Sequence, residues 1–209
     1  MPIITSISVQ EKNKKRCNLF IDGKFYSGIT LDTALRYGLK TNMEISEKQL
    51  SEIVLDSNKL EALTLSINYV TKTLKTKKQV KTYLLGKGFT DEIVWYCIDK
   101  LKEYKYIDDC EYAKRYIETT SKSQGKRLLE YKLMMKGVKK EDINFAYEEC
   151  DVPHKENALA VAEKHIKNKE RTKENLAKTY RYLVGRGFSY EEANYAISKI
   201  KEDNWWKEY

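Results

Sequence analysis

The 209-residue chain contains few of the residues that interrupt helices or bind metals. It has two prolines, two histidines and four cysteines. No two cysteines form a CxxC pair, and neither His154 nor His165 has a cysteine or an acid at the spacing of metal ligands. No arrangement of nucleophile, base and acid is visible either. We therefore predict no metal, no cofactor and no enzymatic activity.

Long hydrophobic runs are also missing. No segment approaches the roughly 20 apolar residues that a membrane span requires. The first residues, Met-Pro-Ile-Ile-Thr-Ser, lack the basic and apolar regions of a secretory signal. Two of the scattered cysteines, Cys97 and Cys150, fall on predicted apolar helix faces, where a free cysteine behaves as a small hydrophobe. We expect a reduced, cytoplasmic protein with no membrane partner.

One short phrase occurs three times in the chain. It reads LLGKGF at residues 84–89, LMMKGV at residues 133–138 and LVGRGF at residues 183–188. Each copy has a leucine four residues before a glycine, a basic residue directly before that glycine and an apolar residue directly after it. The glycine-to-glycine spacings are 137 − 88 = 49 and 187 − 137 = 50 residues. Such a period predicts a tandem array of similar structural units.

The repeated glycine is typical of a helix that has just ended. There it takes a left-handed conformation that a Cβ atom resists, and the apolar residue after it closes over the last turn. We expect Thr90 and Ser189 to cap the helices that follow, Ser189 in a capping box with Glu192, whereas Lys139 offers no such oxygen. No strand precedes these glycines, so turn geometry is favoured over phosphate binding.

The helix after each repeated glycine carries one apolar stripe with the same four offsets. The stripe residues are Val94, Cys97, Ile98 and Leu101, then Ile143, Ala146, Tyr147 and Cys150, then Ala193, Ala196, Ile197 and Ile200. The spacing i, i+3, i+4, i+7 predicts one buried helix face in each unit. The leading helices of the units are predicted at residues 58–74, 108–120 and 153–168, with Asp108 as a cap.

The first thirty residues have a different pattern, with the two-residue alternation of half-buried strands. Asp22-Gly23 suits a tight hairpin turn. A short helix follows at residues 30–37, and Ser46-x-x-Gln49 has the form of a capping box. Because two or three strands are marginally stable alone, this small β unit is interpreted as a capping or docking module.

The predicted fold is mainly α-helical, with tandem three-helix repeats in an elongated array after a small N-terminal β-hairpin or meander unit. The predicted boundaries are 1–56 for the β unit with connecting helices, 57–107 for repeat 1, 108–152 for repeat 2 and 153–209 for repeat 3. Trp205-Trp206 is expected to cover the apolar edge of the last repeat.

Positive charge concentrates on the middle helix of each repeat. The chain has 39 Lys and Arg against 31 Asp and Glu, a net charge of +8, and the acids gather on the helices after the glycines. Stacked middle helices would present a basic face suited to a phosphate backbone or an acidic groove. The alternative is a solvated face with local ion pairs and no ligand. The candidate contact residues are Lys77, Lys78, Lys81, Lys126, Arg127, Lys132, Arg171, Lys173, Lys178 and Arg181.

Taken together, these features resemble the bacterial regulatory protein RecX family. The resemblance rests on the three Lys/Arg-Gly-apolar phrases, on Tyr106-Ile-Asp-Asp-Cys-Glu-Tyr-Ala113 before the second repeat, and on the N-terminal β extension. It covers nearly the whole chain. Lys75-Thr76 and Gln79-Val80 depart from the Arg-Ser and Glu-Leu that family members often carry.

The resemblance implies a non-enzymatic regulator of the RecA recombinase. Such proteins bind the RecA–single-stranded DNA filament along its groove and inhibit ATP hydrolysis, strand exchange and coprotease activity. Single- or double-stranded DNA is a further expected partner, and we expect a monomer. Two alternatives remain open: a general basic nucleic-acid-binding helical-repeat protein, and a helical scaffold that binds only proteins.

Overall fold

A computed structural model describes residues 1–205 of the chain, with side chains described through Glu202. The chain divides into two compact units. Unit 1 contains residues 1–74 and 80–106, and unit 2 contains residues 75–79 together with the chain from Ile107 onward. The boundary therefore falls inside one helix and leaves its first residues with unit 2.

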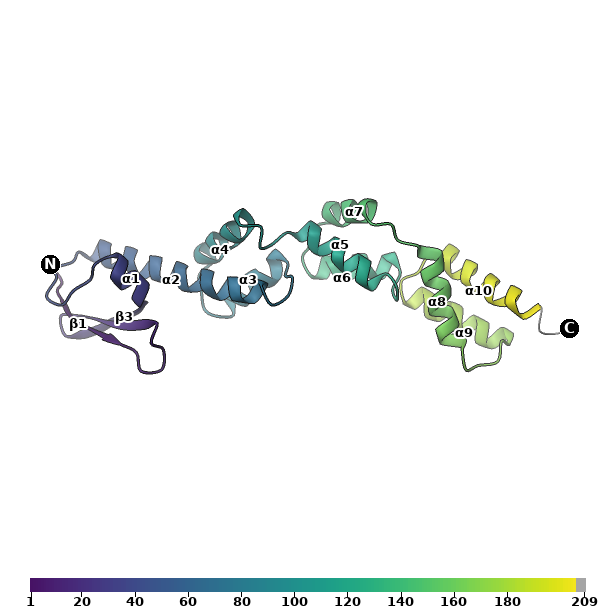
Figure 1. Cartoon of the computed structure of the whole chain (residues 1–209), viewed down its shortest axis with the longest axis horizontal. Coiled ribbons are helices and arrows are strands. Elements are labelled where there is room, and N and C mark those ends of the chain that lie inside the picture. Colours follow the sequence, from purple (N-terminus) through teal and green to yellow (C-terminus); the bar gives the residue numbers. More distant parts are fainter. Residues whose placement is uncertain (206–209) are drawn as a thin grey trace. The chain divides into compact units, whose positions relative to one another are not determined.

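Within the described residues the protein has three strands and ten α-helices (Figure 1). This confirms the predicted mainly helical fold with a small N-terminal sheet. No described helix is both long enough and apolar enough to span a membrane. The elements are β1 (Ile4–Val9), β2 (Arg16–Ile21), β3 (Lys24–Thr30), α1 (Leu31–Arg36), α2 (Glu47–Val70), α3 (Lys77–Leu85), α4 (Asp91–Glu103), α5 (Asp109–Thr120), α6 (Lys126–Met135), α7 (Lys140–Glu149), α8 (His154–Ile166), α9 (Lys173–Gly185) and α10 (Tyr190–Trp205).

The N-terminal sheet is an antiparallel meander in the order β1-β2-β3. Asp22 and Gly23 join β2 to β3 with φ angles of 47° and 79°, the positive values that a two-residue hairpin turn requires. One face of the sheet packs on α1 and the start of α2 through a core that includes Leu19, Ile29 and Leu50. This packing against helices supplies the support that three isolated strands would lack.

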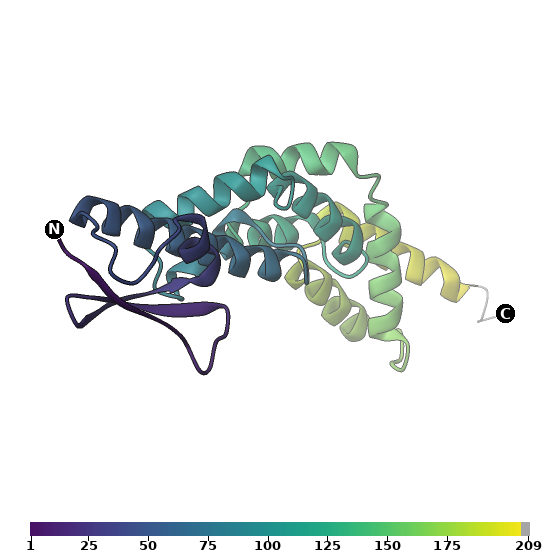
Figure 2. The same ribbon diagram turned by 60° about the vertical axis from the view of Figure 1, so that its left-hand side comes forward.

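Each three-helix repeat is organised by its first and third helices. In unit 1, α2 packs against α4; in unit 2, α5 packs against α7 and α8 against α10 (Figures 1 and 2). The predicted apolar stripes face these contacts: the four stripe residues of α4 are buried, as are all four of α10. In α7 the stripe is buried at Ile143 and Ala146, while Tyr147 and Cys150 are half-buried.

The first leading helix begins earlier than the sequence pattern predicted. The expected helix started at residue 58, but α2 is continuous from Glu47 to Val70. Its start is the predicted capping box, in which the Ser46 hydroxyl accepts from the Gln49 N–H at 3.2 Å and the Gln49 side chain accepts from the Ser46 N–H at 3.0 Å. No proline or glycine lies between these residues and Val70, so nothing in the sequence ends the helix sooner.

The three repeated glycines end the middle helices as predicted. Gly88, Gly137 and Gly187 have φ angles of 89°, 88° and 87°. In each turn the N–H of the following apolar residue donates back to the carbonyl of the leucine that opens the phrase, for example Phe188 to Leu183 at 3.2 Å. This is the hydrogen bonding of a left-handed helix terminus.

Helix starts after these turns agree with the predictions except at one position. Ser189 and Glu192 form the predicted capping box, with N–H to side-chain bonds of 2.8 and 3.2 Å. Lys139 makes no side-chain cap, as expected. The prediction for Thr90 was wrong, because its side chain makes no capping hydrogen bond although the residue stands at the N-cap of α4. Asp91 and Glu92 supply negative charge to that first turn instead.

The glycine turns also join successive repeats. The first turn of α6 meets the turn that ends α9: the Gly125 N–H donates to the Arg186 carbonyl at 3.0 Å, and the Arg127 N–H to the Gly187 carbonyl at 3.3 Å. Helix N-terminal donors thus meet helix C-terminal acceptors. A Cβ atom on Gly187 would lie 2.4 Å from the Cβ of Leu128. We call this contact between a helix start and a glycine turn the repeat joint.

A second repeat joint lies within unit 2 between residues 76–78 and the turn that ends α6. The Thr76 hydroxyl donates to the Lys136 carbonyl at 2.7 Å, and the Lys78 ammonium donates to the Met135 carbonyl at 3.1 Å. A Cβ atom on Gly137 would lie 2.4 Å from the Cβ of Lys78. The repeated glycine is therefore required twice over, by its backbone angle and by the close approach of the preceding repeat.

The predicted role of Trp205-Trp206 lies outside the described residues. Trp205 ends α10, but its side chain and the whole of Trp206 are not among them.

We predict that alanine substitutions at four glycines change the stability of the protein to different degrees, according to what surrounds each glycine. Gly187→Ala should lower the free energy of unfolding by more than about 2 kcal/mol, because left-handed strain of about 1 kcal/mol adds to the clash with Leu128. Gly137→Ala should behave similarly. In Gly88→Ala the new Cβ would have no neighbour within 4 Å, so the free energy of unfolding should fall only by the cost of the left-handed backbone. Urea denaturation followed by circular dichroism measures these differences.

Gly185→Ala provides the matched control, since Gly185 is helical and a Cβ there would also have no neighbour within 4 Å. It should be neutral or stabilising by up to about 1 kcal/mol. Equal losses for Gly88→Ala and Gly187→Ala would show that the repeat joint does not constrain the glycine.

Candidate partner-binding surface

The structure places all ten predicted contact cations on, or directly before, the three middle helices α3, α6 and α9. Their position on these helices follows from the repeat pattern. Their surroundings differ, however, and several of their charged groups have partners within the protein. Their role in partner binding stays a prediction.

The cations of α3 are largely engaged by the protein itself. Lys77 lies beside Asp109, whose carboxylate accepts from the Lys77 N–H at 2.9 Å and lies 3.8 Å from its ammonium. Asp109 is only 4% exposed, and burial raises its pKa despite this hydrogen bond. Lys78 belongs to a repeat joint. In unit 1, Lys81 pairs with Asp91 at 3.0 Å and its ammonium lies 5.0 Å from the centre of the Trp95 ring.

The cations of α6 line a cleft beside a repeat joint. Lys126 and Arg127 border this cleft of about 360 Å³ together with Phe188, Tyr190 and the acids Glu130 and Glu192, and Lys126 pairs with Glu130 at 3.8 Å. The Lys126 ammonium also lies 4.7 Å from the centre of the Tyr147 ring. The Arg127 guanidinium lies 3.4 Å from the Val184 carbonyl.

Lys132, the remaining candidate of α6, does not line this cleft. Its ammonium donates to the Gln124 side chain at 2.7 Å. Burial raises the pKa of Tyr147, whose ring lies beside Lys126 and whose hydroxyl is buried without a hydrogen-bond partner among the described residues. The Tyr147 phenol therefore stays neutral and adds no negative charge beside Lys126.

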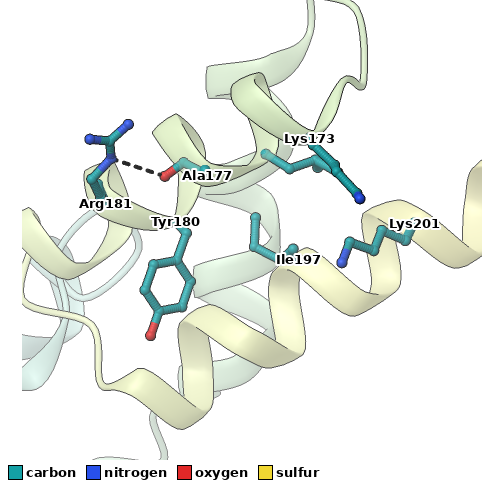
Figure 3. A pocket seen from close by; sticks show the side chains of 7 residues that line it. Lys173, Ala177, Tyr180, Arg181, Ile197 and Lys201 are labelled. Carbon is teal, nitrogen blue, oxygen red and sulfur yellow. Dashed lines mark hydrogen bonds between the residues drawn. The ribbon is translucent and has the colours of Figure 1, made fainter.

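The α9 cations Lys173 and Arg181 line a cleft with Lys201 of α10. Lys173 from α9 and Lys201 from α10 extend along the same cleft, with Tyr180 and Ile197 between the two helices (Figure 3). Arg181 lines the same cleft of about 370 Å³, although its guanidinium points away and its Nε donates to the Ala177 carbonyl at 3.4 Å. Among the side chains described, through Glu202, no acidic residue lines this cleft.

The two other α9 candidates are paired within the repeat. Lys178 forms an ion pair with Glu174 at 2.6 Å, one helical turn away. Arg171 lies just before the helix and donates to the Ile200 carbonyl at 2.9 Å, which ties the start of α9 to α10. Removing Arg171 would therefore disturb packing as well as charge.

Sequence reasoning missed Lys201 and the aromatic surface. Lys201 lies on α10, which the charge pattern had marked as an acidic helix, and only the packing of α10 on α9 brings it to Lys173. The exposed aromatic side chains include Trp95 at 49% and Tyr190 at 64%.

His165 is an internal packing residue. Its ring stacks on Tyr182 with centroids 4.2 Å apart, and its Nδ1 lies 3.0 Å from the Thr179 hydroxyl. Burial, and secondarily the charge of Lys169, lowers the pKa of His165. Among the described residues no group of three or more His, Cys, Asp or Glu side chains is placed to hold a metal ion.

The geometry defines a class of protein: a small N-terminal sheet followed by a tandem array of three-helix repeats that presents charged and aromatic side chains. Family models identify the class more narrowly. The N-terminal domain of regulatory protein RecX matches residues 2–46, its second three-helix domain residues 108–146, and its third residues 155–197.

Curated relatives match nearly the whole chain. The regulatory protein RecX of Clostridium tetani is 32% identical over 202 residues, covering 94% of each chain. That of Clostridium beijerinckii is 32% identical over 205 residues and 96% of each chain. That of Bacillus licheniformis is 30% identical and covers 98% of this chain and 80% of the relative. The chain belongs to the RecX family of regulatory proteins.

Solved structures support the same fold. A crystal structure of regulatory protein RecX aligns with a TM-score of 0.69 at 23% identity, covering 95% of this chain and all of the other. RecX from Lactobacillus salivarius aligns with a TM-score of 0.61 at 22% identity, covering 69% of this chain and 97% of the other.

We predict that His165 makes the protein less stable in mild acid. Because the pKa of His165 is lowered in the folded protein, the unfolded chain binds a proton at this residue more tightly. The contribution of neutral His165 to the free energy of unfolding is therefore complete above the ordinary histidine pKa of about 6.5. That contribution is lost as pH falls below this value. Thermal unfolding at pH 7.5 and 5.5 should show a drop in Tm that is smaller in His165→Asn.

The matched control is His154→Asn, which removes the other histidine but leaves His165 in place. It should retain the full acid-induced drop in Tm. If the drop is the same in wild type and His165→Asn, the half-buried imidazole of His165 is not its source.

Proposed function

We propose that this protein binds the RecA–single-stranded DNA filament and inhibits RecA ATP hydrolysis, strand exchange and coprotease activity. The observation that carries the proposal is the match to RecX regulatory proteins along 94% or more of the chain. The RecX resemblance implies RecA as the target, and a RecA partner implies the cytoplasm. The protein acts by binding and not by catalysis.

The clefts of unit 2 are the best candidates for contact with the filament. Two clusters of cations, Lys126 with Arg127 and Lys173 with Lys201, lie on successive repeats. A filament repeats its acidic and phosphate groups at fixed intervals, so a protein with repeated cationic sites gains affinity by engaging several at once. Such a ligand inhibits by binding one filament state more tightly than the states that alternate with it during ATP hydrolysis.

The first test is the single-stranded-DNA-dependent ATPase rate of RecA from the same source, with this protein added below the RecA concentration. We expect strong inhibition. A rate that stays unchanged while the protein is shown to be folded would contradict the proposal.

Charge reversal should identify the contact surface. Lys173→Glu with Lys201→Glu should weaken inhibition at least about tenfold, because repulsion replaces attraction in a cleft that Lys173, Arg181 and Lys201 line. The helical circular dichroism should not change. The control pair Lys40→Glu with Lys48→Glu alters net charge equally at exposed positions outside the middle helices and should inhibit as wild type does. Equal loss in both pairs would indicate net charge alone.

A general nucleic-acid-binding function is the second candidate. The half-buried ring of Tyr180 lines the same cleft as Lys173 and Lys201, and an aromatic ring beside cations offers stacking and phosphate contacts together. This function requires DNA binding without RecA, with affinity that falls steeply as salt rises. A shift assay with single-stranded DNA, run beside the ATPase assay, separates the two: DNA binding without RecA inhibition favours this second function.

A further inference from the structure

The repeat joint is made twice in the chain, and each of its two halves also occurs once without its counterpart. In the two complete joints the start of a middle helix covers the glycine turn of the next repeat. Three repeats supply three helix starts and three glycine turns, so one turn and one helix start are left over. These are the turn at Gly88 and the start of α9.

The Gly88 turn has the conformation of the others but none of their cover. Its φ angle of 89° matches the 87° of Gly187. A Cβ on Gly88 would meet no atom within 4 Å, whereas Gly187 touches Leu128. Gly88 is exposed and Phe89 half-buried, while Phe188 is only 2% exposed. The turn borders an open cleft of about 380 Å³ in unit 1.

The start of α9 is uncovered in the complementary way. The N-cap residues of the first two middle helices, Thr76 and Gly125, are buried beneath the next glycine turn, but Thr172 is exposed. Beside it lies the cleft of about 370 Å³ between α9 and α10 (Figure 3). Its lining combines apolar side chains such as Leu176 and Ile197 with cations.

One position in each free half carries an opposite charge. In the complete joint, Tyr190 follows the glycine turn by three residues and lines one cleft with Lys126 and Arg127. Asp91 holds the place of Tyr190 after Gly88; its side chain is 67% exposed and pairs with Lys81 of its own chain at 3.0 Å. In α9, Lys173 holds the position of Lys126 and Glu174 that of Arg127, and Glu174 pairs with Lys178 at 2.6 Å. The contact would bring Asp91 of one chain to Lys173 of another.

We propose that two copies of this chain associate head to tail, with the Gly88 turn of one copy seated on the start of α9 of the other. This contact between chains has the same form as the repeat joint that is made within each chain. The contact consists of one glycine turn and one helix start, and we expect so limited a contact to be weak. The monomer is the dilute state, and the contact forms when copies are concentrated or held in line by a shared target.

The contact is heterologous, since it uses two different surfaces of the protein. Each added copy brings one new free turn and one new free helix start, so the association does not stop at a dimer. The proposal needs neither RecA nor DNA and is tested without them. Its failure would leave the proposed RecA function untouched.

Thiol cross-linking of two single-cysteine copies tests the contact. The half-buried Cys110 and Cys150 are first replaced by serine, which leaves only the buried Cys17 and Cys97. One copy then carries Thr90→Cys, and a second copy with a size tag carries Ala177→Cys. By the repeat pattern these positions correspond to Ser189 and Glu130, which line one cleft. A short bismaleimide should join the two copies preferentially at high protein concentration.

Three controls make the result decisive. The double variant Glu130→Cys with Ser189→Cys should cross-link within one chain and calibrates the reagent. A copy with Thr119→Cys, exposed on α5, replaces Ala177→Cys and gives the yield of random collision. Adding Asp91→Lys to the Thr90→Cys copy should reduce the yield to that random level.

We expect the Thr90–Ala177 mixture to give several-fold more mixed product than the Thr90–Thr119 mixture. Equal yields in these two mixtures overturn the proposal, as does a Thr90–Thr90 product that exceeds the mixed one. A preferential yield that Asp91→Lys leaves unchanged also overturns it, because the proposed contact places that carboxylate against cations.

Discussion

The architecture depends on one backbone constraint, the need for a residue without a Cβ atom at the end of each middle helix. In the two complete repeat joints this residue must adopt a positive φ angle and also admit the preceding repeat to within 2.4 Å of where its Cβ would be. Only glycine meets both conditions. The carbonyl groups left free at the helix end then become acceptors for the start of the next helix, so ending a helix and joining two repeats are one event.

Much of the fold could be predicted because it is encoded in local patterns. The Asp22-Gly23 turn, the capping boxes at Ser46 and Ser189, and the apolar stripe of α4 each depend on residues within a few positions of one another. Local chemistry misled at Thr90, where the hydroxyl makes no capping bond. It was also silent about the repeat joints, since Thr76 and Lys136 meet only after the helices have packed.

The candidate surface was less predictable than the fold, because a cation's place on a helix does not determine what its charge meets. Lys132 and Lys178 lie on the expected helices but have partners within their own repeats. Lys201 was overlooked because the charge pattern along the sequence assigned its helix to the acids. The place of a cation on its helix follows from the sequence repeat, whereas its freedom to contact a partner protein or DNA depends on side chains from other helices.

The boundary within α3 has a consequence for how such arrays grow and diverge. Residues 75–79 fold with unit 2, while the same helix from Val80 onward folds with unit 1. The boundary of the repeated sequence segment and the boundary of the compact structural unit therefore fall at different places in the chain. A recombination event that moved a repeat cut at its sequence boundary would separate Asp109 from the Lys77 N–H that it accepts from. Viable exchanges should instead break the chain just before a middle helix. Each transferred piece then carries the helix start that contacts the glycine turn of the next repeat.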